Sequence, residues 1–436
     1  MAPAEILVAS VSDVPKVASA LLRDDAMTDL THRGITAPQI GGAARPGLCT
    51  DCGISRIGDG KACGRACQFI QPDYPAHEAR VHRRLPQDAT DERFFGVTKA
   101  MLRARLSPPA PDAQWTGITT ALAAHALETG LVTAVLAVGP DPDDRWKPRP
   151  VLITEAAAMA AARWMRMGYA PTLALLEPAR AAGHTRVALI GIPCQVYALR
   201  ALEAELGFER IYVIGTPCSD NTTTEHFHRF LALVDPTPDR VSYLEFRADY
   251  RVEIRYDDGR PHRLIPFLKL PLSTLPADFF PMTCKTCVDY SNRLSDITVG
   301  YMGGDGDQWV IVRNDRGAEL LAGIADRLTT RPLTDKGKRT GAVKGFMVNT
   351  ELAAGGLPLR RMPDWLRPIM AWLQPRIGPK GLEFARARLE MKAVETILHL
   401  RRAHPARLKN MVPDHVWKIA AKYGLTPGEG ETRKDE

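Results

Sequence analysis

The 436-residue sequence lacks any apolar run long enough to cross a membrane: runs such as Val187–Ile192 fall far short of about 20 residues. Its N-terminus, MAPAEILVASVSD, has no basic region followed by an apolar stretch, so we expect no signal peptide and a cytoplasmic location. It has neither a paired Cys/His finger nor an RNP sequence, which argues against the common nucleic-acid-binding modules. With 45% apolar and 25% charged residues, what remains is a globular protein of two or three domains.

The net charge of +7 is concentrated near the C-terminus. Residues 351–436 contain 16 Lys/Arg and 10 Asp/Glu, so the first 350 residues are nearly neutral. Such a basic segment is either a solvated helix face or a surface that attracts nucleic acid, an anionic membrane or an acidic protein. We expect the tryptophans of this region, Trp365, Trp372 and Trp417, to pack between helices rather than to form a cofactor site.

The eight cysteines fall into two groups. The first four follow the spacing Cys-x2-Cys-x10-Cys-x3-Cys, at Cys49, Cys52, Cys63 and Cys67. In a chain without an export signal, clustered cysteines are more often metal or redox ligands than disulfides. Four thiolates suit either zinc or an iron–sulfur cluster, and the spacing alone leaves both open for this group.

Two further cysteines end a repeated pattern. The segments RVALIGIPC (186–194) and RIYVIGTPC (210–218) are both short β-branched runs that end in Gly-x-Pro-Cys. The amphipathic stretch 195–206 between them predicts a strand–helix–strand unit with parallel strands. The two cysteines then lie just past the carboxyl ends of neighbouring strands, where open α/β sheets bind ligands.

Cys194 and Cys218 have no partner nearby in the sequence, and each could be an ordinary core cysteine. A four-ligand site at the sheet edge needs two more thiols, and the pair Cys284 and Cys287 is left over. We therefore predict a second group made of Cys194, Cys218, Cys284 and Cys287. Because it combines three separate segments, it favours an embedded redox cluster over a local zinc finger.

The pattern of elements predicts an α/β fold in four parts. These are an N-terminal cysteine-bearing module (1–95), an α/β domain (96–240), an α+β region with an antiparallel β insertion (241–345) and a basic helical segment (346–436). The second part contains predicted helices at 118–129 and 154–168 and predicted strands at 131–138 and 171–176. The third contains an antiparallel pair at 241–248 and 251–257, and further strands at 295–300 and 309–313.

At this point the sequence resembles the flavin- and iron–sulfur-containing family related to the β subunit of coenzyme F420-reducing hydrogenase. The family hallmarks are GIPCQVYALR (191–200), the strand before Cys218, and CKTCVDYSNRLSDITVGYMG (284–303). The segments QWTGITTALAAHALETGLV (114–132), TPCSDNTTTEHFHRFL (216–231), LEFRADYRVEIRYDDG (244–259) and VIVRNDRGAELL (310–321) resemble its chlorophyll-pathway branch. That branch holds ferredoxin-dependent divinyl chlorophyllide 8-vinyl reductases and 7-hydroxymethyl chlorophyll a reductases. The resemblance covers roughly residues 45–325.

The resemblance implies one FAD, two 4Fe–4S clusters and reduced ferredoxin as the electron donor. It makes 1–95 the first cluster module, 96–240 the FAD-binding domain and 241–345 the region that completes both sites. The later cysteine group matches the second cluster residue by residue. In the first group the family's third cysteine is Ser55 here, and Cys63 is expected to replace it.

The resemblance also places FAD contacts on two segments. Gly117 would allow close backbone approach to a pyrophosphate at a helix N-terminus, although an ordinary N-cap explains the same pattern. The expected contacts are Trp115, Thr116, Gly117, Thr119, Thr120, Gly300 and Tyr301. The last two follow a strand that carries Asp296, in the family's flavin-proximal segment.

The implied activity is reduction of the C8 vinyl group of a divinyl (proto)chlorophyllide to ethyl in (bacterio)chlorophyll synthesis. Alternatives are 7-hydroxymethyl chlorophyll a reduction, an F420-linked oxidoreductase and an electron-transfer subunit. No catalytic residue is assigned, since His125, His226 and His228 are proton donors by type only. A tetrapyrrole substrate, a homo-oligomer and peripheral membrane contact are all compatible with this interpretation.

Overall fold

The computed structural model describes residues 33–40, 48–57, 62–247, 249–301, 306–357 and 362–433. The first 32 residues of the predicted N-terminal module lie outside this range, as do Ala248, Met302 and Gly303 of the predicted strand and hallmark segments. No described helix has the length and hydropathy needed to span a bilayer.

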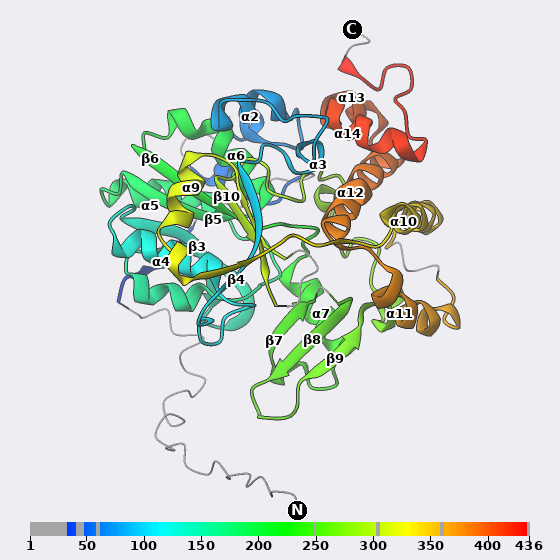
Figure 1. Ribbon diagram of the computed structural model, residues 1–436, viewed down its shortest axis with the longest axis horizontal. Coiled ribbons are helices and arrows are strands. Elements are labelled where there is room, and N and C mark those ends of the chain that lie inside the picture. Colours follow the sequence, from blue (N-terminus) through cyan, green and yellow to red (C-terminus); the bar gives the residue numbers. More distant parts are fainter. Residues whose placement is uncertain are drawn as a thin grey trace, which may run out of the picture.

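The structure contains both helices and strands (Figure 1). The helices are α1 (Ala62–Ala66), α2 (Tyr74–His82), α3 (Glu92–Phe95), α4 (Ile118–Glu128), α5 (Leu176–Ala181), α6 (Pro193–Leu202), α7 (Thr224–Val234), α8 (Met282–Lys285), α9 (Asp315–Ala322), α10 (Arg339–Ala353), α11 (Leu366–Ile377), α12 (Leu382–Ala403), α13 (Leu408–Met411) and α14 (Asp414–Ala420). The strands are β1 (Ile35–Thr36), β2 (Ala100–Leu106), β3 (Ala134–Asp141), β4 (Asp144–Ile153), β5 (Arg186–Gly191), β6 (Arg210–Gly215), β7 (Val241–Phe246), β8 (Arg251–Tyr256), β9 (Arg263–Pro266), β10 (Ile297–Gly300), β11 (Gln308–Val312), β12 (Leu328–Arg331), β13 (Asp335–Lys336) and β14 (Lys380–Gly381).

The main sheet has nine strands in the order β1-β4-β3-β5-β6-β10-β11-β2-β12. Its centre, β3-β5-β6-β10, is parallel, and antiparallel strands flank it on both sides. Side chains alternate between its faces: Leu136, Leu189 and Val213 pack towards α6, whereas Val135 and Ala188 pack towards α4. This confirms the predicted mixed α/β sheet.

The predicted strand–helix–strand unit is confirmed as β5–α6–β6. The two strands are parallel and in register from Arg186 opposite Arg210 to Gly191 opposite Gly215. Pro193 begins α6, which the fixed backbone angle of proline favours at a first helical turn. Cys194 and Cys218 therefore start from adjacent positions at one end of the sheet.

A second sheet of three antiparallel strands, β7-β8-β9, confirms the predicted antiparallel insertion. It lies below the main sheet in Figure 1 and forms its own core with α7, around Phe227, Phe230 and Ile254. Later in the region 241–345 the chain returns to the main sheet as β10, β11 and β12, and β13 pairs with β14 in a separate two-stranded sheet.

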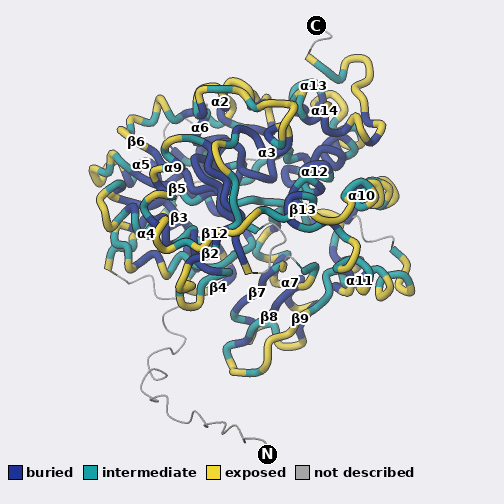
Figure 2. The backbone as a smooth tube through the Cα atoms, viewed as in Figure 1, coloured by how far each residue is buried: buried dark blue, intermediate teal, exposed yellow. Residues whose placement is uncertain are grey.

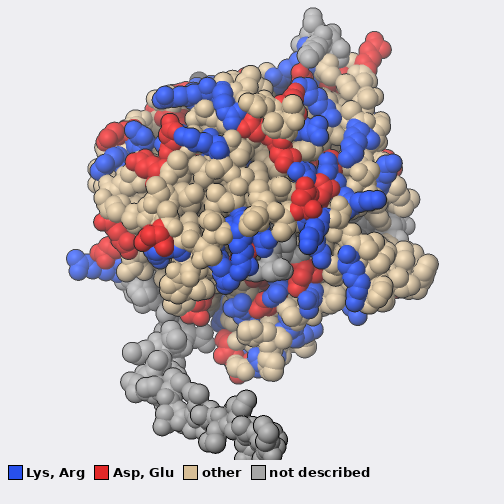
Figure 3. Space-filling view, viewed as in Figure 1, with Lys and Arg blue, Asp and Glu red and all other residues tan. Residues whose placement is uncertain are grey.

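The C-terminal segment is helical, as predicted. Its central helix, α12, is largely buried (Figure 2) and packs against α10, α14 and α8. Trp417 is buried in this core, but Trp365 and Trp372 are 70% and 60% exposed, so the packing prediction was wrong for these two. Trp365 precedes α11 and Trp372 lies on it. The surface around this helix, at the lower right of Figure 3, is largely uncharged.

Two predicted elements were wrong. The expected helix at 154–168 is only a 3₁₀ helix over Ala156–Ala162, and Trp164, with φ at 74°, cannot continue it. The expected strand at 171–176 is a 3₁₀ turn followed by α5. On the side of β3 away from β5, the neighbouring strand is β4, which contains Pro148 and Pro150 and therefore resembles a loop in sequence.

Asp296 precedes β10 and is fully buried. It pairs with Arg200 of α6, also fully buried, at 2.8 Å, and it accepts hydrogen bonds from Val213 N and Asn314 Nδ2. The Arg200 and Arg316 charges and these hydrogen bonds outweigh burial, so the pKa of Asp296 lies below its usual value. Asp296 therefore has a structural role, as the partner of Arg200, that does not involve a flavin contact.

We predict that Asp296→Ala lowers the free energy of unfolding by about 3 kcal/mol, because it leaves the buried Arg200 with only Glu203 to balance its charge. Urea unfolding followed by circular dichroism would measure this loss. Asp258→Ala, at an exposed turn, removes the same charge and should change stability little. Equal losses in the two variants would contradict the assigned role.

Candidate functional site

The four cysteines of the second group line one cavity. Cys194 lies in the first turn of α6, Cys218 follows β6, Cys284 is on α8 and Cys287 follows α8. The prediction that these three segments meet at the end of the sheet is therefore confirmed. Pro193 of α6 and Thr283 of α8 also line it, and the rest of the lining comes from loops, including Thr50, Tyr169 and Asn221.

Hydrogen-bond donors surround the sulfur atoms of this group. Asn221 N lies 3.3 Å from Cys284 Sγ, and Gln68 Nε2 lies 3.7 Å from Cys287 Sγ. Such donors orient and stabilise anionic sulfur. In addition, Cys218 N donates to Tyr290 O at 3.0 Å, which fixes the backbone of that cysteine.

Burial raises the thiol pKa values in this group, to about 12 for Cys284 and about 11 for Cys287. Burial also raises the pKa values of Cys194 and Cys218 well above the usual value, with the neighbouring thiols adding to the effect. Thiolates in this cavity therefore require a cationic centre to balance their charge. Four sulfur ligands are the donor set that zinc and iron–sulfur centres take.

The two kinds of centre differ in ligand spacing. Among the described residues, no three His, Cys, Asp or Glu side chains converge on the position of a single metal ion. A zinc ion needs its ligands at about 2.3 Å from one point. The shared cavity supplies the four-sulfur donor set that both kinds of centre take.

The first cysteine group lies on the segments around α1. Cys49, Cys63 and Cys67 all act electrostatically on Cys52, whose pKa is raised to about 12, chiefly by burial. Cys49 Sγ is 3.3 Å from Asp51 N, and burial raises the pKa of Cys67 to about 11. The four thiols are thus neighbours, with Cys63 among them.

The two groups are close to each other. Thr50, between Cys49 and Cys52, lines the second cavity, and Cys52 acts electrostatically on Cys194. Gln68, next to Cys67, reaches Cys287. The arrangement places two four-thiol sites side by side at the carboxyl end of the parallel strands.

The residues predicted to contact FAD lie at the same end of the sheet as the cysteines, and their individual environments differ from one another. Gly117, with φ at 89°, precedes α4, and a Cβ there would meet Ala110 and Ala113 at 2.9 and 3.0 Å. Thr116 is buried; its hydroxyl donates to Gln308 Oε1 at 2.9 Å, and Ile118 N donates to the same oxygen. The loop packing by itself therefore requires this glycine.

Thr119 and Thr120 open α4 and are half-buried. Trp115 and Tyr301 stack with ring centroids 5.6 Å apart and an interplanar angle of 11°. Gly300 ends β10 against Pro217, whose ring atoms would lie 2.3 Å from an added Cβ. The two predicted segments thus meet through the Trp115–Tyr301 pair.

A carboxyl that the sequence did not single out lies beside this pair. Glu245 of β7 is 5% exposed and accepts a hydrogen bond from Tyr243 OH, and Trp115 is its neighbour. Burial raises its pKa above the usual value. Opposite it on β8, Glu253 bonds to Arg255 and Arg247, which lower its pKa against the effect of burial.

Among the described residues, the three histidines considered as proton donors do not line the sulfur cavity and do not contact the Trp115–Tyr301 pair. His228 is exposed and pairs with Asp144 at 2.7 Å, while the His125 ring packs against Gly323. His226 stacks on Phe279 at 5.8 Å.

The sequence analysis also missed the contribution of α12. Residues spaced by four on this helix face the site: Phe384 contacts Tyr301, Lys392 Nζ bonds to Cys284 O at 2.9 Å and Thr396 bonds to Cys287 O at 3.3 Å. Lys392 also pairs with Asp220 at 2.5 Å. The i, i+4 spacing of a basic helix was the available signal, but it does not reveal what the helix covers.

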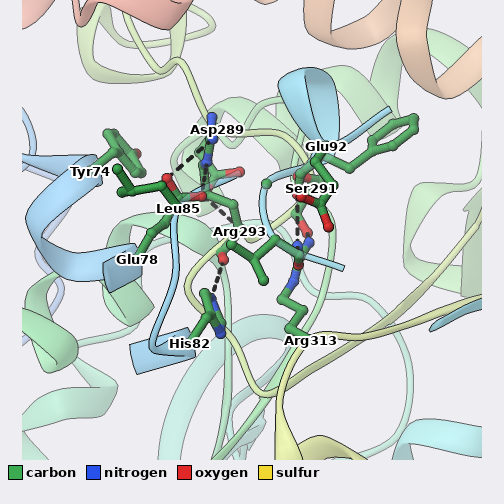
Figure 4. Close-up of polar contacts among 12 residues, drawn as sticks. Tyr74, Glu78, His82, Leu85, Glu92, Asp289, Ser291, Arg293 and Arg313 are labelled. Carbon is green, nitrogen blue, oxygen red and sulfur yellow. Dashed lines mark hydrogen bonds and ion pairs between the residues drawn. The ribbon is translucent and has the colours of Figure 1, made fainter. Parts of the chain in front are cut away.

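A buried polar network holds the chain after Cys287 (Figure 4). Arg293 Nε bonds to Glu78 Oε1 at 2.8 Å, and Arg293 N donates to Asp289 Oδ2 at 3.0 Å. Arg313 donates to Ser291 O at 2.8 Å. Because every side chain in this network is buried, the position of the Cys284–Cys287 segment is fixed against α2 and the sheet.

Two family models match the chain, and both describe the beta subunit of coenzyme F420 hydrogenase/dehydrogenase. The model of its N-terminal part matches residues 101–177, and the model of its C-terminal part matches residues 184–336. The chain belongs to this family. An uncharacterized protein of Nostoc sp. is 36% identical over 87% of this chain and 94% of its own length.

The chloroplastic 7-hydroxymethyl chlorophyll a reductase of Oryza sativa subsp. japonica is 35% identical over 86% of this chain and 82% of its own length. The predicted relationship to a branch that includes a chlorophyll reductase is therefore confirmed. A chain of the F420-reducing hydrogenase complex from Methanosarcina barkeri has a TM-score of 0.48 and 23% identity, covering 55% of this chain and 84% of its own.

Proposed function

We propose that this protein reduces a substituent of a chlorophyll-type tetrapyrrole, and that its substrate is the C8 vinyl group of a divinyl (proto)chlorophyllide. The observation that carries the proposal is the 35% identity, over most of both chains, to a reductase whose name gives a chlorophyll as its substrate. The resemblance of 216–231 and 244–259 to the chlorophyll-pathway branch supports the same class. The second candidate, favoured by the relative's name, is reduction of 7-hydroxymethyl chlorophyll a.

The proposal includes two 4Fe–4S clusters, one FAD and reduced ferredoxin. Four thiols around one cavity, with donors to the sulfur atoms of Cys284 and Cys287, support the second cluster, and the neighbouring first group supports the other. The Trp115–Tyr301 pair would hold the flavin beside them. When bound, these groups supply single-electron relay and a two-electron hydride donor, which reduction of a vinyl group requires.

The chain itself would supply the proton. Reduction of a vinyl group by hydride leaves one carbon that must accept a proton from a general acid. Glu245 is the carboxyl best suited to this role, because burial raises its pKa and it lies beside Trp115. Tyr243, which donates to Glu245, would orient the carboxyl.

Anaerobic incubation with each pigment tests the substrate. With reduced ferredoxin, we expect conversion of divinyl chlorophyllide to its 8-ethyl product, separated by chromatography. Conversion of 7-hydroxymethyl chlorophyll a alone would favour the second candidate. Reaction with reduced F420 but not with ferredoxin would favour an F420-linked oxidoreductase, and turnover only within a larger complex would favour an electron-transfer subunit.

Metal content tests the cofactor assignment. We predict about eight iron atoms and one FAD per chain, falling to about four iron atoms in Cys218→Ser and in Cys63→Ser, because each removes one ligand of a different cluster. Ser55→Ala, at the position of the family's usual third cysteine, should retain all the iron. If Cys63→Ser also retains it, Cys63 is not a ligand.

The pH dependence of turnover tests Glu245. A general acid must be protonated, so we predict that the rate falls as the pH rises through the raised pKa of this carboxyl. Glu245→Gln should lower turnover by at least about 10²-fold and abolish this limb of the profile. Glu253→Gln, its cross-strand neighbour with a lowered pKa, should keep the limb. An unchanged profile in Glu245→Gln would exclude this donor.

A further inference from the structure

A small cavity lies between the main sheet and the antiparallel insertion, where the loop after the 3₁₀ helix passes β4 and β7. Its lining combines two arginines with aromatic and aliphatic side chains: Arg145, Trp146, Trp164, Met165, Arg166, Ser242, Tyr243 and Leu244. It is separate from the sulfur cavity, with which it shares no lining residue. Its lining contains none of the cysteines and not the proposed proton donor Glu245.

Arg166 has an unusual environment for a guanidinium. Its Nη1 donates to Arg163 O at 2.7 Å, but its Nε is buried and has no hydrogen-bond partner among the described residues. No carboxylate in the described part of the chain pairs with it. Burial alone lowers its pKa to about 10. A half-buried guanidinium with an unpartnered N–H and no counter-charge would be stabilised by a ligand that supplies an anionic acceptor.

Arg145 adds a second donor to the same cavity. Its Nη2 pairs with Asp257 at 3.0 Å, and Asp257 also lies 3.8 Å from Arg240, so one carboxylate is shared by two arginines. Within the described residues, Arg145 Nη1 is buried without a hydrogen-bond partner. The cavity thus has an excess of positive charge and at least two unused N–H donors.

The cavity adjoins the residues expected to hold the flavin. Trp164 Nε1 donates to Asp112 O at 2.5 Å, and Arg163 Nη1 donates to Pro111 O at 2.7 Å, which joins this loop to the one that precedes Trp115. The Trp164 ring meets Tyr243 at 6.1 Å, and Tyr243 bonds to Glu245. Arg166 and Trp115 thus lie on two loops that these hydrogen bonds join.

We propose that Arg166 and Arg145 bind an oxyanion group of a ligand in the proposed flavin and substrate site. Guanidinium groups present paired N–H donors that match phosphate and carboxylate oxygens. Two ligands could supply this group: the pyrophosphate of FAD, or the free propionate of a chlorophyllide. The inference rests on the proposed function for the identity of the ligand, but the anion site itself does not depend on turnover.

The test compares Arg166→Met and Arg166→Lys with Arg180→Met, a control that removes the same charge at an exposed position on α5. Tryptophan fluorescence, with Trp164 in the cavity wall, would follow titration of the flavin-free protein with inorganic pyrophosphate and with FAD. We expect Arg166→Met to weaken at least one of these, or the binding of a free-acid pigment, by about tenfold or more. Arg166→Lys should recover part of the loss, and Arg180→Met should bind as the wild type does.

Comparing how Arg166→Met changes the binding of each ligand shows whether the anion is the phosphate of FAD or the carboxylate of the pigment. Weaker binding of FAD and pyrophosphate identifies the phosphate. A higher KM for divinyl chlorophyllide, with no change for its methyl ester, identifies the carboxylate. If the wild type binds pyrophosphate but contains no flavin, the flavin assignment fails while the anion site stands.

Stability distinguishes a binding role from a structural one. Because Arg166 is half-buried, with its Nε shielded from solvent and no carboxylate partner among the described residues, Arg166→Met should keep or raise the melting temperature of the ligand-free protein. A lowered melting temperature together with unchanged binding of pyrophosphate, FAD and free-acid pigment would overturn the proposal.

Discussion

Three buried arginines determine where the second cysteine pair lies. Arg200 pairs with Asp296, Arg293 pairs with Glu78, and Arg313 donates to Ser291 O, so the chain between Cys287 and β10 is held from the sheet, from α6 and from α2. All three guanidinium groups are removed from solvent, where each requires its partner. This constraint brings Cys284 and Cys287 to the strand ends that already carry Cys194 and Cys218.

The C-terminal helices complete the site. The two matched family models end at residue 336, yet Lys392 and Thr396 of α12 bond to the backbone carbonyls of Cys284 and Cys287. Lys392 is buried, and its charge is shared with Asp220 and Glu395. The basic character of this segment is therefore partly a property of the interior and not only of a solvated surface.

Basic side chains, some of them paired with carboxylates such as Asp220 and Glu395, lie around the proposed cofactor sites. Lys392 lies at the sulfur cavity, and Arg388 of α12 acts on Tyr290 and Tyr301. Arg145 and Arg166 lie at the adjoining cavity. A ligand that gains electrons or carries phosphate or carboxylate groups becomes more favourable in such surroundings. The proposed cofactors and the proposed anion site are consistent with one another in this respect.

The sequence by itself determined the β5–α6–β6 unit, because strand and helix periodicity and the Gly-x-Pro-Cys ends are local features. It also grouped the four later cysteines, since parallel strands place their ends together. Only the tertiary structure decided the partners that come from distant segments. The strand β4 was hidden by its prolines, and the burial that raises the pKa of Glu245 arises from packing across segments. Arg166 has the sequence context of an ordinary surface arginine, and only the fold encloses it with no carboxylate partner among the described residues.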